Sequence, residues 1–468
     1  MLMNRSIHRR SFLKETIRSS AAIGLAGSTA PLFASSTSPR LQAGQGIVDT
    51  SVPNGVELGG FHRPPDNPRV ATGVRQPTAS RAIALRCGDV EVALVSLDVL
   101  AVSSDFTQKV QSRVQGELGI PAQNVHITAT HTHSTPSFIH LRQWGKIPEA
   151  YMVQTIDAVV QSIKLAYADL APAELFLGKA QAKGANFNRT TPNHRTDLEF
   201  DQNSTDAERW VDTLLQTLRF QRVAGKPDII WYHFSSHPVC FTDTLSGPDW
   251  VGMVVNMVKD SEGVEPGFWQ GHAGDVNPGD GKRWIGTPDQ SANAVYSAIK
   301  DALSSSVSVP VQEIRPTAGK FLLPYDHQRV ARDVEAYRTH PETCSGGTWV
   351  DPPFAADWYA AAKDWPAEPQ GLAAPMSAIS LGPIGMLFQP TELYSYYGIE
   401  IRKTSPFEHT LVVGYTDDET GYVTDPSAYE QLDYAAIVGP KILNRPYFQP
   451  TSGRELSKAA KAMLASLS

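Results

Sequence analysis

The chain has 468 residues, of which 41% are hydrophobic and 19% charged, and its formal net charge is −7. These values are typical of a folded globular protein and exclude a fibrous or disordered chain. Because an acidic protein does not attract polyanions, we exclude nucleic acid and an anionic membrane surface as primary partners.

The N-terminus has the pattern of an export signal. Arg9 and Arg10 precede a short, weakly apolar stretch over residues 21–33, and small residues follow around Ala34. This order predicts a twin-arginine (Tat) signal peptide over residues 1–34; the alternative is an ordinary amphipathic helix. The same residues hold five basic side chains and one acidic side chain, so the remainder has a net charge of −11.

The signal predicts export by the Tat machinery to the periplasm or the medium. A flexible link is expected over residues 35–46 and one catalytic domain over residues 47–468. No later segment has about 18 consecutive apolar residues, so no transmembrane span is predicted.

Strand-like and helix-like patterns alternate along the rest of the chain. Strands are predicted at residues 90–100, 125–130, 173–177, 229–233, 320–323 and 411–415. Helices are predicted at residues 106–118, 151–168, 250–258, 290–303, 328–337 and 393–402. This mixture predicts an α/β fold in which mixed β-sheets are flanked by helices.

Two further segments can be interpreted from their turn residues. Residues 213–231 contain Ala-Gly-Lys-Pro near their centre, which favours a β-hairpin. Proline and glycine gather over residues 338–375, where we expect an insertion or a lid.

The run Thr-His-Thr-His-Ser over residues 130–134 is the first candidate for a metal site. Side chains alternate along a strand, so a His-x-His pair at a strand end would place His131 and His133 on the same face. Two neutral imidazoles on one face are suited to zinc, but two hydrogen-bonded histidines are the simpler alternative.

A second strand end supplies another histidine, His237, just before Pro238. His233 precedes it by four residues, but the helical zinc-protease pattern needs a glutamate where Phe234 stands, so His233 is interpreted as structural or pocket-lining. Cys240 is interpreted as a structural thiol, because nothing in its surroundings marks it as activated.

Four stretches of the sequence occur in the order seen in the neutral ceramidases. They are residues 129–134, residues 186–190, the strand end at His237, and a C-terminal pair at 389–392 and 421–424. With a further match at residues 71–82, the chain resembles the catalytic domain of that family over roughly residues 47 to 440.

The resemblance implies roles for seven residues. It implies one zinc ion per chain, with the ligands His131, His237, Glu392 and Tyr422. It implies catalytic roles for His133 as a substrate-polarising neighbour, for Arg189 near the reacting carbonyl, and for Tyr434. Judged singly, the arginine would be a surface ion-pair residue, the tyrosines packing groups, and the glutamate an acid at a helix N-terminus.

The chain departs from the family at two points. Residues 274–278 read Gly-Asp-Val-Asn-Pro, where the family has Gly-Asp-Val-Ser-Pro, so Asn277 replaces a serine and cannot act as a serine nucleophile. Asp275 is expected to order this loop without binding metal. We expect the family's C-terminal immunoglobulin-like domain to be absent, which weakens the expectation of access to membrane lipids.

The resemblance therefore implies an exported zinc hydrolase that uses zinc-bound water to cleave an N-acyl amide, either a ceramide-like lipid or another acylated envelope molecule. Two alternatives remain open. One is a zinc hydrolase of esters or lactones, because the same nucleophile attacks any acyl carbon. The other is a non-catalytic zinc-containing binding protein, which the change at Asn277 would explain.

Overall fold

A nine-stranded mixed sheet forms the larger β-layer of the computed structural model, which describes residues 40–223 and 225–468. Its strands, in spatial order, are β13 (Gly267–Gln270), β11 (Ile229–Phe234), β10 (Leu214–Arg222), β6 (Ala171–Gln181), β1 (Gln42–Asp49), β3 (Ala79–Cys87), β4 (Val90–Leu97) and β5 (Val125–Ala129). The ninth strand, β15 (Val307–Val309), pairs with β6. Neighbouring strands are antiparallel except for the β11–β13 and β4–β5 pairs.

A second, four-stranded sheet packs against the first. It contains β16 (Ile314–Pro324), β17 (Gly371–Leu381), β18 (Ile384–Phe388) and β20 (His409–Val413). Alternation along β3 shows how the two faces are used, since successive side chains point to opposite sides of a strand. Ile83 and Leu85 pack with residues of the four-stranded sheet, whereas Ala82 and Ala84 pack with residues of two helices on the other face.

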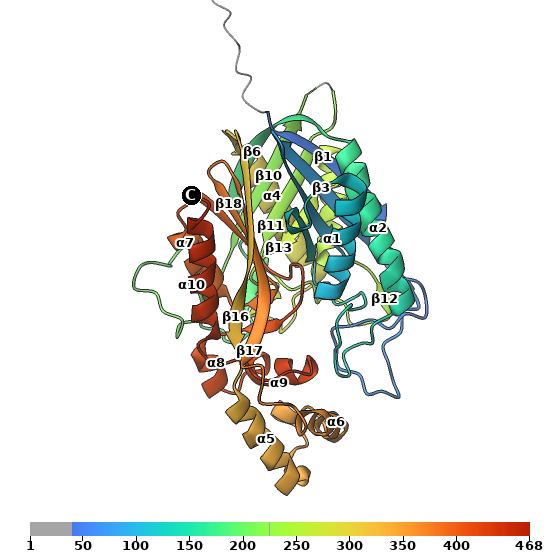
Figure 1. The fold of residues 1–468 in the computed structure, drawn as a ribbon, viewed down its shortest axis with the longest axis vertical. Helices are drawn as coiled ribbons and strands as arrows, with labels where there is room; N and C mark the ends of the chain where they lie inside the picture. The colour runs from blue at the N-terminus through green and yellow to red at the C-terminus, as the bar shows by residue number, and fades with distance from the viewer. Residues whose placement is uncertain (1–39, 224) are drawn as a thin grey trace, which may run out of the picture. The chain divides into compact units, whose positions relative to one another are not determined.

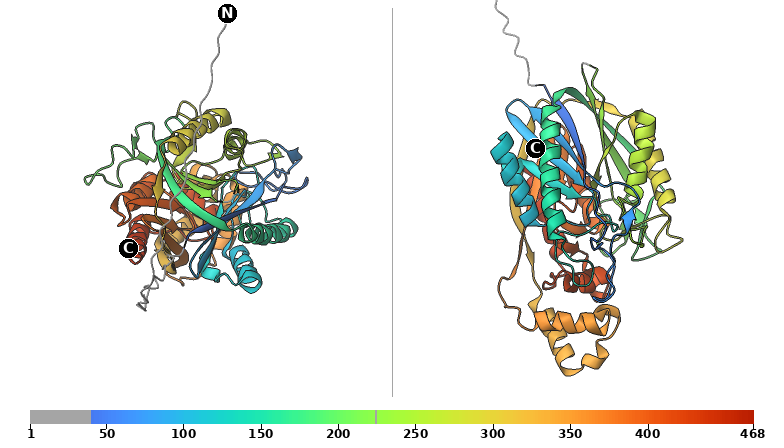
Figure 2. Two further views of the ribbon diagram at one scale, coloured as in Figure 1. Left: turned by 90° about the horizontal axis from the view of Figure 1, so that it is seen from above. Right: turned by 90° about the vertical axis from the view of Figure 1, so that its right-hand side faces the viewer.

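Helices cover the outer faces of both sheets. α1 (Ser104–Leu118) and α2 (Glu149–Ala168) lie on one part of the nine-stranded sheet, and α7 (Ser395–Thr404) and α10 (Ser452–Ala465) cover the four-stranded sheet (Figure 1). α4 (Pro288–Ser304) packs against β6 and β10, and α3 (Trp250–Glu262) packs against α4; both are coloured yellow-green in Figure 2 and lie on a different side from the teal α2. The layers are therefore helix, sheet, sheet and helix.

Four short strand pairs stand apart from the two sheets, and two of them, β7–β14 and β19–β21, carry polar residues discussed below. They are β7 (Asn186–Asn188) with β14 (Val276–Pro278), β19 (Thr391–Leu393) with β21 (Gly421–Val423), β2 (Gly73–Val74) with β12 (Leu245–Ser246), and β8 (Arg195–Thr196) with β9 (Trp210–Val211). After β21 come the short helices α8 (Pro426–Glu430) and α9 (Tyr434–Ile442).

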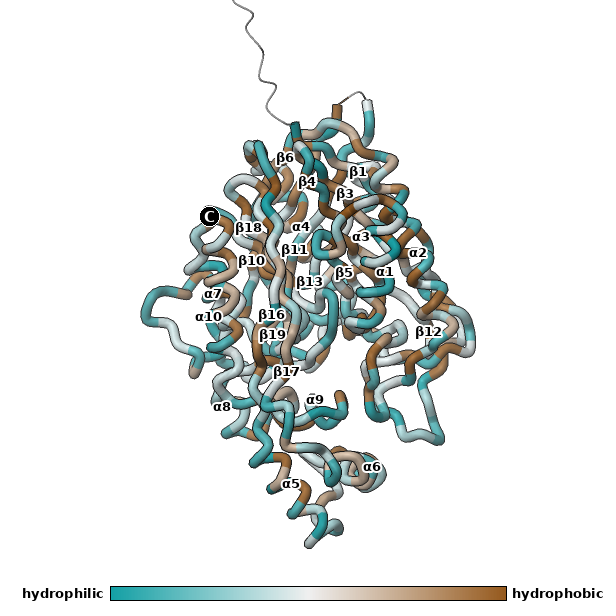
Figure 3. Tube along the Cα trace, viewed as in Figure 1, coloured by the Kyte–Doolittle hydropathy of each residue, from teal (hydrophilic) through white to brown (hydrophobic). Residues whose placement is uncertain are grey.

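An insertion separates β16 from β17 and contains α5 (His327–Thr339) and α6 (Pro352–Ala362). α5 is largely hydrophilic and has Val330 as its buried residue (Figure 3). α6 packs inward, where Phe354 lies 5.8 Å from the ring of Trp144. Lys441 of α9 lies 3.5 Å above the Trp349 ring and donates to the Thr348 carbonyl.

The α/β class predicted from the sequence is confirmed, and so is the hairpin, as β10 pairs with β11 in antiparallel register. The predicted helix over residues 393–402 begins later, because residues 391–393 form β19. β3 was missed, since Arg81 interrupts its apolar run. The arginine is buried, with Nη1 2.7 Å from Oδ2 of Asp98 and Nη2 3.0 Å from Oε1 of Glu265.

The flexible link predicted over residues 35–46 is wrong for residues 42–46. These residues belong to β1, which pairs with β3 along its whole length, and the small residues Ala43, Gly44 and Gly46 suit close packing against α2. A Cβ atom at Gly46 would lie 2.0 Å from the Ser162 carbonyl oxygen, so this strand needs glycine to approach the helix. The predicted Tat signal lies outside the described residues. Within them, no helix combines the length and apolar character that crossing a membrane requires.

Candidate metal centre and active site

Three histidine side chains converge at the ends of β5 and β11. The ring nitrogen atoms that His131, His133 and His237 can offer to a metal lie within 4.8 Å of one another. β5 ends at Ala129, and His131 has a left-handed backbone with φ of 64°. The expectation that strand alternation aligns the first two imidazoles is therefore wrong, although the sharp turn still brings them together.

Each of the three imidazoles is oriented in the same way. The Nδ1 atoms lie 2.8 to 2.9 Å from the backbone carbonyls of Leu100, Gly60 and Val276, for His131, His133 and His237 respectively. A carbonyl only accepts, so each Nδ1 carries the proton and each Nε2 keeps a free lone pair. This is the arrangement that holds imidazole ligands in protein metal sites.

Glu392 adds a carboxylate to the group. Its Oε2 atom lies 3.1 Å from Nε2 of His237 and 3.4 Å from Nε2 of His131. The glutamate is the middle residue of β19, where it pairs in register with Tyr422 of β21. It is therefore not in the first turn of α7, which was the alternative interpretation from the sequence.

The surroundings of His133 and His237 favour the neutral imidazole. Burial, together with the positive charge of Arg189, lowers the pKa of His237 to about 4. Burial also holds the pKa of His133 well below its ordinary value, with a smaller contribution from His131. Neutral imidazole is the form that binds a metal ion.

Arg189 and the two tyrosines lie beside this group. Nη2 of Arg189 donates to the Gly274 carbonyl at 2.7 Å and to the Tyr422 hydroxyl at 3.0 Å. Burial opposes the charge of Arg189, but Tyr422 and Glu392 outweigh that effect and raise the pKa of the guanidinium. The rings of Tyr422 and Tyr434 lie 6.1 Å apart at 73°. Arg189 is thus partly buried at the site, where it lines the cleft, and is not a surface ion-pair residue.

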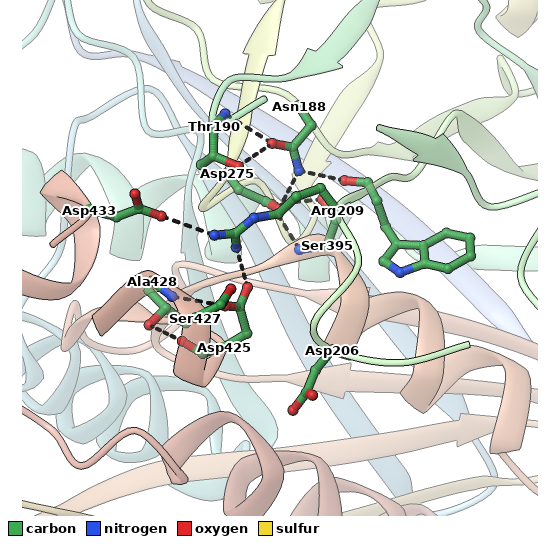
Figure 4. Close-up of polar contacts among 12 residues, drawn as sticks. Asn188, Thr190, Asp206, Arg209, Asp275, Ser395, Asp425, Ser427, Ala428 and Asp433 are labelled. Carbon is green, nitrogen blue, oxygen red and sulfur yellow. Dashed lines mark hydrogen bonds and ion pairs between the residues drawn. The ribbon is translucent and has the colours of Figure 1, made fainter. Parts of the chain in front are cut away.

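A network of buried charges supports the chain segments that carry these tyrosines (Figure 4). Arg209 forms ion pairs with Asp425, which follows β21, and with Asp433, which directly precedes Tyr434. In the same view Asp275 accepts from Asn188 at 2.7 Å and from the Ser395 backbone and hydroxyl at 2.8 and 2.7 Å. Asp275 therefore ties β7, β14 and α7 together, as expected for a loop-ordering carboxylate.

Two hollows lie beside the histidines and share His133, Tyr422 and Tyr434 in their linings. The larger one, the outer cleft, has a volume of about 550 Å³, and its lining also includes Arg189 and Asn277. The smaller one, the inner cavity, has a volume of about 50 Å³, and its lining includes three of the four candidate ligands, His131, Glu392 and Tyr422. His133 lines both hollows, whereas His237 is fully buried and lines neither.

Asn277 lies in the wall of the outer cleft. Its Nδ2 donates to the Trp284 carbonyl at 2.6 Å, and its residue pairs with Phe187 across the β7–β14 ladder. The side chain thereby holds the loop that follows β14. His233 donates from Nε2 to the Val412 carbonyl at 2.9 Å, as a structural histidine would, and burial raises the pKa of Cys240 well above its ordinary value.

Two residues of the site were missed from the sequence, and both lie between β20 and β21. The Tyr415 ring lies 4.4 Å from the ring of His131. Glu419 is buried in the wall of the inner cavity. Burial raises the pKa of Glu419 well above its ordinary value, and the charge of Glu392 raises it further. The available signal was an Asp-Asp-Glu run at residues 417–419, between the predicted strand at 411–415 and the motif at 421–424.

Residues 41–283 match the family model of the neutral/alkaline non-lysosomal ceramidase N-terminal domain. The chain belongs to this ceramidase family. The match includes His131, His133, Arg189 and His237 and ends before Glu392, Tyr422 and Tyr434.

Two curated ceramidases are similar over part of the chain. The neutral ceramidase of Mycobacterium tuberculosis is 30% identical over 162 residues, which cover 32% of this chain and 25% of the relative. The neutral ceramidase of Pseudomonas aeruginosa is 28% identical over 166 residues, which cover 33% of this chain and 24% of the relative. The aligned part thus spans about a quarter of the length of either relative.

Solved ceramidase structures share the fold over a longer stretch. The crystal structure of neutral ceramidase from Pseudomonas aeruginosa superimposes with a TM-score of 0.68 at 18% identity, covering 92% of this chain and 74% of that one. A structure described as ceramidase complexed with C2 gives the same TM-score and identity, with coverage of 92% and 75%. The ceramidase-like α/β fold therefore extends beyond the part matched by the family model.

Proposed function

We propose that this protein is a zinc-dependent hydrolase of N-acyl amides, with a ceramide-like lipid or another acylated envelope molecule as substrate. One observation carries the proposal. Three imidazoles, each fixed through Nδ1 so that Nε2 is free, and the Glu392 carboxylate gather beside the outer cleft and the inner cavity. Membership of the ceramidase family supports the amide as the bond that is cleaved.

We infer that His131, His237, Glu392 and Tyr422 hold one zinc ion. The donor set fits zinc, since it offers imidazole nitrogen and anionic oxygen in a buried place. The short distances of Glu392 Oε2 to both histidines support a shared ion. When bound, zinc would act as a Lewis acid and make water a nucleophile near neutral pH.

His133, Arg189 and Tyr434 are proposed to act on the substrate. His133 faces both hollows, which suits a group that polarises the scissile carbonyl. Arg189 and Tyr434 line the outer cleft and would stabilise the negative charge that develops on the carbonyl oxygen during attack. The Asn277 amide would take no covalent part, which agrees with its hydrogen bond to the loop after β14.

Metal analysis of the purified protein, combined with a panel of acyl substrates, tests the proposal. We expect about one zinc per chain and release of fatty acid from N-acyl amides that a chelator abolishes and added zinc restores. Hydrolysis of esters or lactones but not of amides would show that the enzyme cleaves one of these other acyl bonds instead. Full zinc occupancy without hydrolysis of any acyl compound would contradict an enzymatic function.

We further propose that residues 1–34 are a Tat signal and that residues 47–468 form one catalytic domain. The paired Arg9 and Arg10 support the first part. The compact unit over Pro39–Ser468 supports the second. Replacing both arginines with lysine should retain the protein in the cytoplasm, measured by fractionation; unchanged export would contradict the signal.

A further inference from the structure

The wall of the inner cavity includes a buried acid, Glu419, that the proposed reaction does not use. Most of the wall beyond the histidines is apolar, formed by residues that include Leu100, Ile139, Leu141, Ile442 and Leu443. Glu419 interrupts this apolar wall and is only 3% exposed. A carboxyl group among aliphatic side chains is unfavourable unless its oxygen atoms are hydrogen-bonded.

One of the two carboxyl oxygens of Glu419 has a structural task. Oε1 accepts a hydrogen bond from the backbone nitrogen of Gly421 at 2.7 Å and so shapes the turn that leads into β21. Oε2 is buried and has no hydrogen-bond partner among the residues that the structure describes. Buried polar atoms of this kind are rare in folded proteins and call for a ligand or a water molecule as partner.

The position of Glu419 shows what could supply this partner. The cavity it lines also contains His131, His133 and Glu392, so a substrate held at these groups would extend one end toward Glu419. A space of about 50 Å³ holds roughly three to five water-sized groups. It accommodates a short substituent, whereas the outer cleft of about 550 Å³ takes the larger part of the molecule.

We propose that Glu419 selects substrates in which a short substituent next to the scissile bond carries a hydrogen-bond donor, either a hydroxyl or an amino group. The donor pairs with Oε2 of Glu419 in the wall of the cavity and takes the place of a water molecule there. A purely aliphatic substituent of the same length fills the space but leaves the carboxyl oxygen unpaired, which sites of this kind discriminate against. The inference rests on the proposed hydrolase function and names its substrate class.

Two mirrored panels of short amides test the selection with the zinc-loaded full chain. The first joins one fluorogenic amine to butanoyl, 3-hydroxybutanoyl, 4-hydroxybutanoyl or 4-aminobutanoyl groups. The second joins an acetyl group to butylamine, 4-aminobutanol or 1,4-diaminobutane. In at least one panel, we expect a hydroxyl or amino compound to exceed its aliphatic counterpart about tenfold or more in kcat/KM. Comparison of the hydroxyl compounds with the amino compounds shows which of the two donors Glu419 recognises.

Two substitutions connect the preference to Glu419. Glu419→Gln retains an oxygen for the Gly421 N–H and a polar group in the cavity, so the hydroxyl preference should persist and an amino preference should fall. Glu419→Leu should bring the ratio of polar to aliphatic kcat/KM close to one. The matched control is Glu430→Leu on the exposed end of α8, which should leave the ratio unchanged.

The outcomes separate the two proposals. If the wild-type enzyme hydrolyses aliphatic compounds as well as polar ones in both panels, the selection by Glu419 is wrong while the hydrolase function stands. If neither panel nor any longer amide is cleaved, the proposed function fails and the inference fails with it. Zinc content should be equal in all variants; loss of zinc from Glu419→Gln would make Glu419 a metal-binding residue and overturn its role in selection. If Glu419→Leu does not fold, the wild-type ratios of polar to aliphatic kcat/KM still show whether the enzyme selects a donor-bearing substituent.

Discussion

The side-chain amide of Gln270 donates to the backbone carbonyl of Thr130 at 3.2 Å, and so holds the segment that carries His131. The same amide donates to the Ser236 carbonyl at 2.9 Å, while its oxygen accepts from the Ser236 backbone nitrogen at 3.2 Å. Gln270 is fully buried at the end of β13. One side chain thus links the residues directly before two candidate zinc ligands, His131 and His237.

Gln270→Glu should lower both stability and zinc affinity. A carboxylate of nearly the same shape accepts but does not donate, so both carbonyls lose their donor in a buried place. Leaving buried polar groups unpaired costs about 1–3 kcal/mol each. Urea unfolding and zinc titration would measure the effects, with the exposed Gln115→Glu on α1 as control. Unchanged zinc affinity would show that Gln270 does not organise the ligands.

Gly60→Ala should impair activity through His133. Gly60 accepts from Nδ1 of His133, has a φ of 92°, and a Cβ atom there would lie 2.5 Å from that nitrogen. Gly55 is a matched control, because its φ is 91° and a Cβ atom would meet nothing within 4 Å. Both alanine variants carry the same backbone strain, so only Gly60→Ala should lower kcat beyond any shared loss of stability. Equal kinetic effects would contradict a role for this contact.

Because different roles are proposed for the three histidines, their replacement should affect zinc content and kcat differently. His131→Ala and His237→Ala should each abolish stoichiometric zinc, measured by metal analysis of the purified variants. His133→Ala should retain zinc and lose about 100-fold or more in kcat, as expected when a transition-state donor is removed. Loss of zinc from His133→Ala would instead make it a third imidazole ligand, which its Nε2 distance of 3.4 Å from Nε2 of His131 would accommodate.

Arg209→Gln should disturb the tyrosines without touching the metal. The change leaves Asp425 and Asp433 unpaired, and removing one partner from buried ion pairs costs about 3–5 kcal/mol. We expect lower stability and lower kcat, full zinc occupancy, and partial recovery with Arg209→Lys. Arg195→Gln provides a control, because its ion pair with Glu208 is largely exposed. A normal kcat in folded Arg209→Gln would show that this network does not position Tyr434.

Lys441 predicts a dependence of stability on pH. Burial lowers its pKa to about 8 from an ordinary value of 10.5, against the opposing charge of Asp333. Between pH 8 and 10.5 the unfolded chain therefore binds more protons at this residue than the folded chain. Its contribution to the free energy of unfolding should rise across this window by up to about 3 kcal/mol.

Replacing Lys441 with methionine should remove this slope. Urea unfolding of wild type and Lys441→Met at pH 7.5 and pH 9.5 would measure it as the difference between the two proteins. The wild type should gain stability relative to the variant at the higher pH. A constant difference would mean that Lys441 titrates normally in the folded state.

Local patterns in the sequence determined the class of the fold and the positions of α1 to α5 and α7. Helix α1, for example, has an apolar periodicity that ends at Gly119, and the hairpin β10–β11 has its turn residues in place. The histidines, Glu392 and the two tyrosines could be selected by resemblance to a family, because short motifs persist in a sequence where the chain needs a particular side chain.

Only the tertiary structure decided how these residues meet. His131 and His237 are 106 positions apart, and they are brought together by the turn after β5, the end of β11 and the amide of Gln270. β3 escaped prediction because Arg81 is paired by residues distant in sequence. In the sequence Glu419 is one of three consecutive acidic residues. Its burial depends on apolar residues of separate segments, such as Leu100, Ile139 and Ile442. Burial and pairing are properties of contacts between distant segments, which local periodicity does not encode.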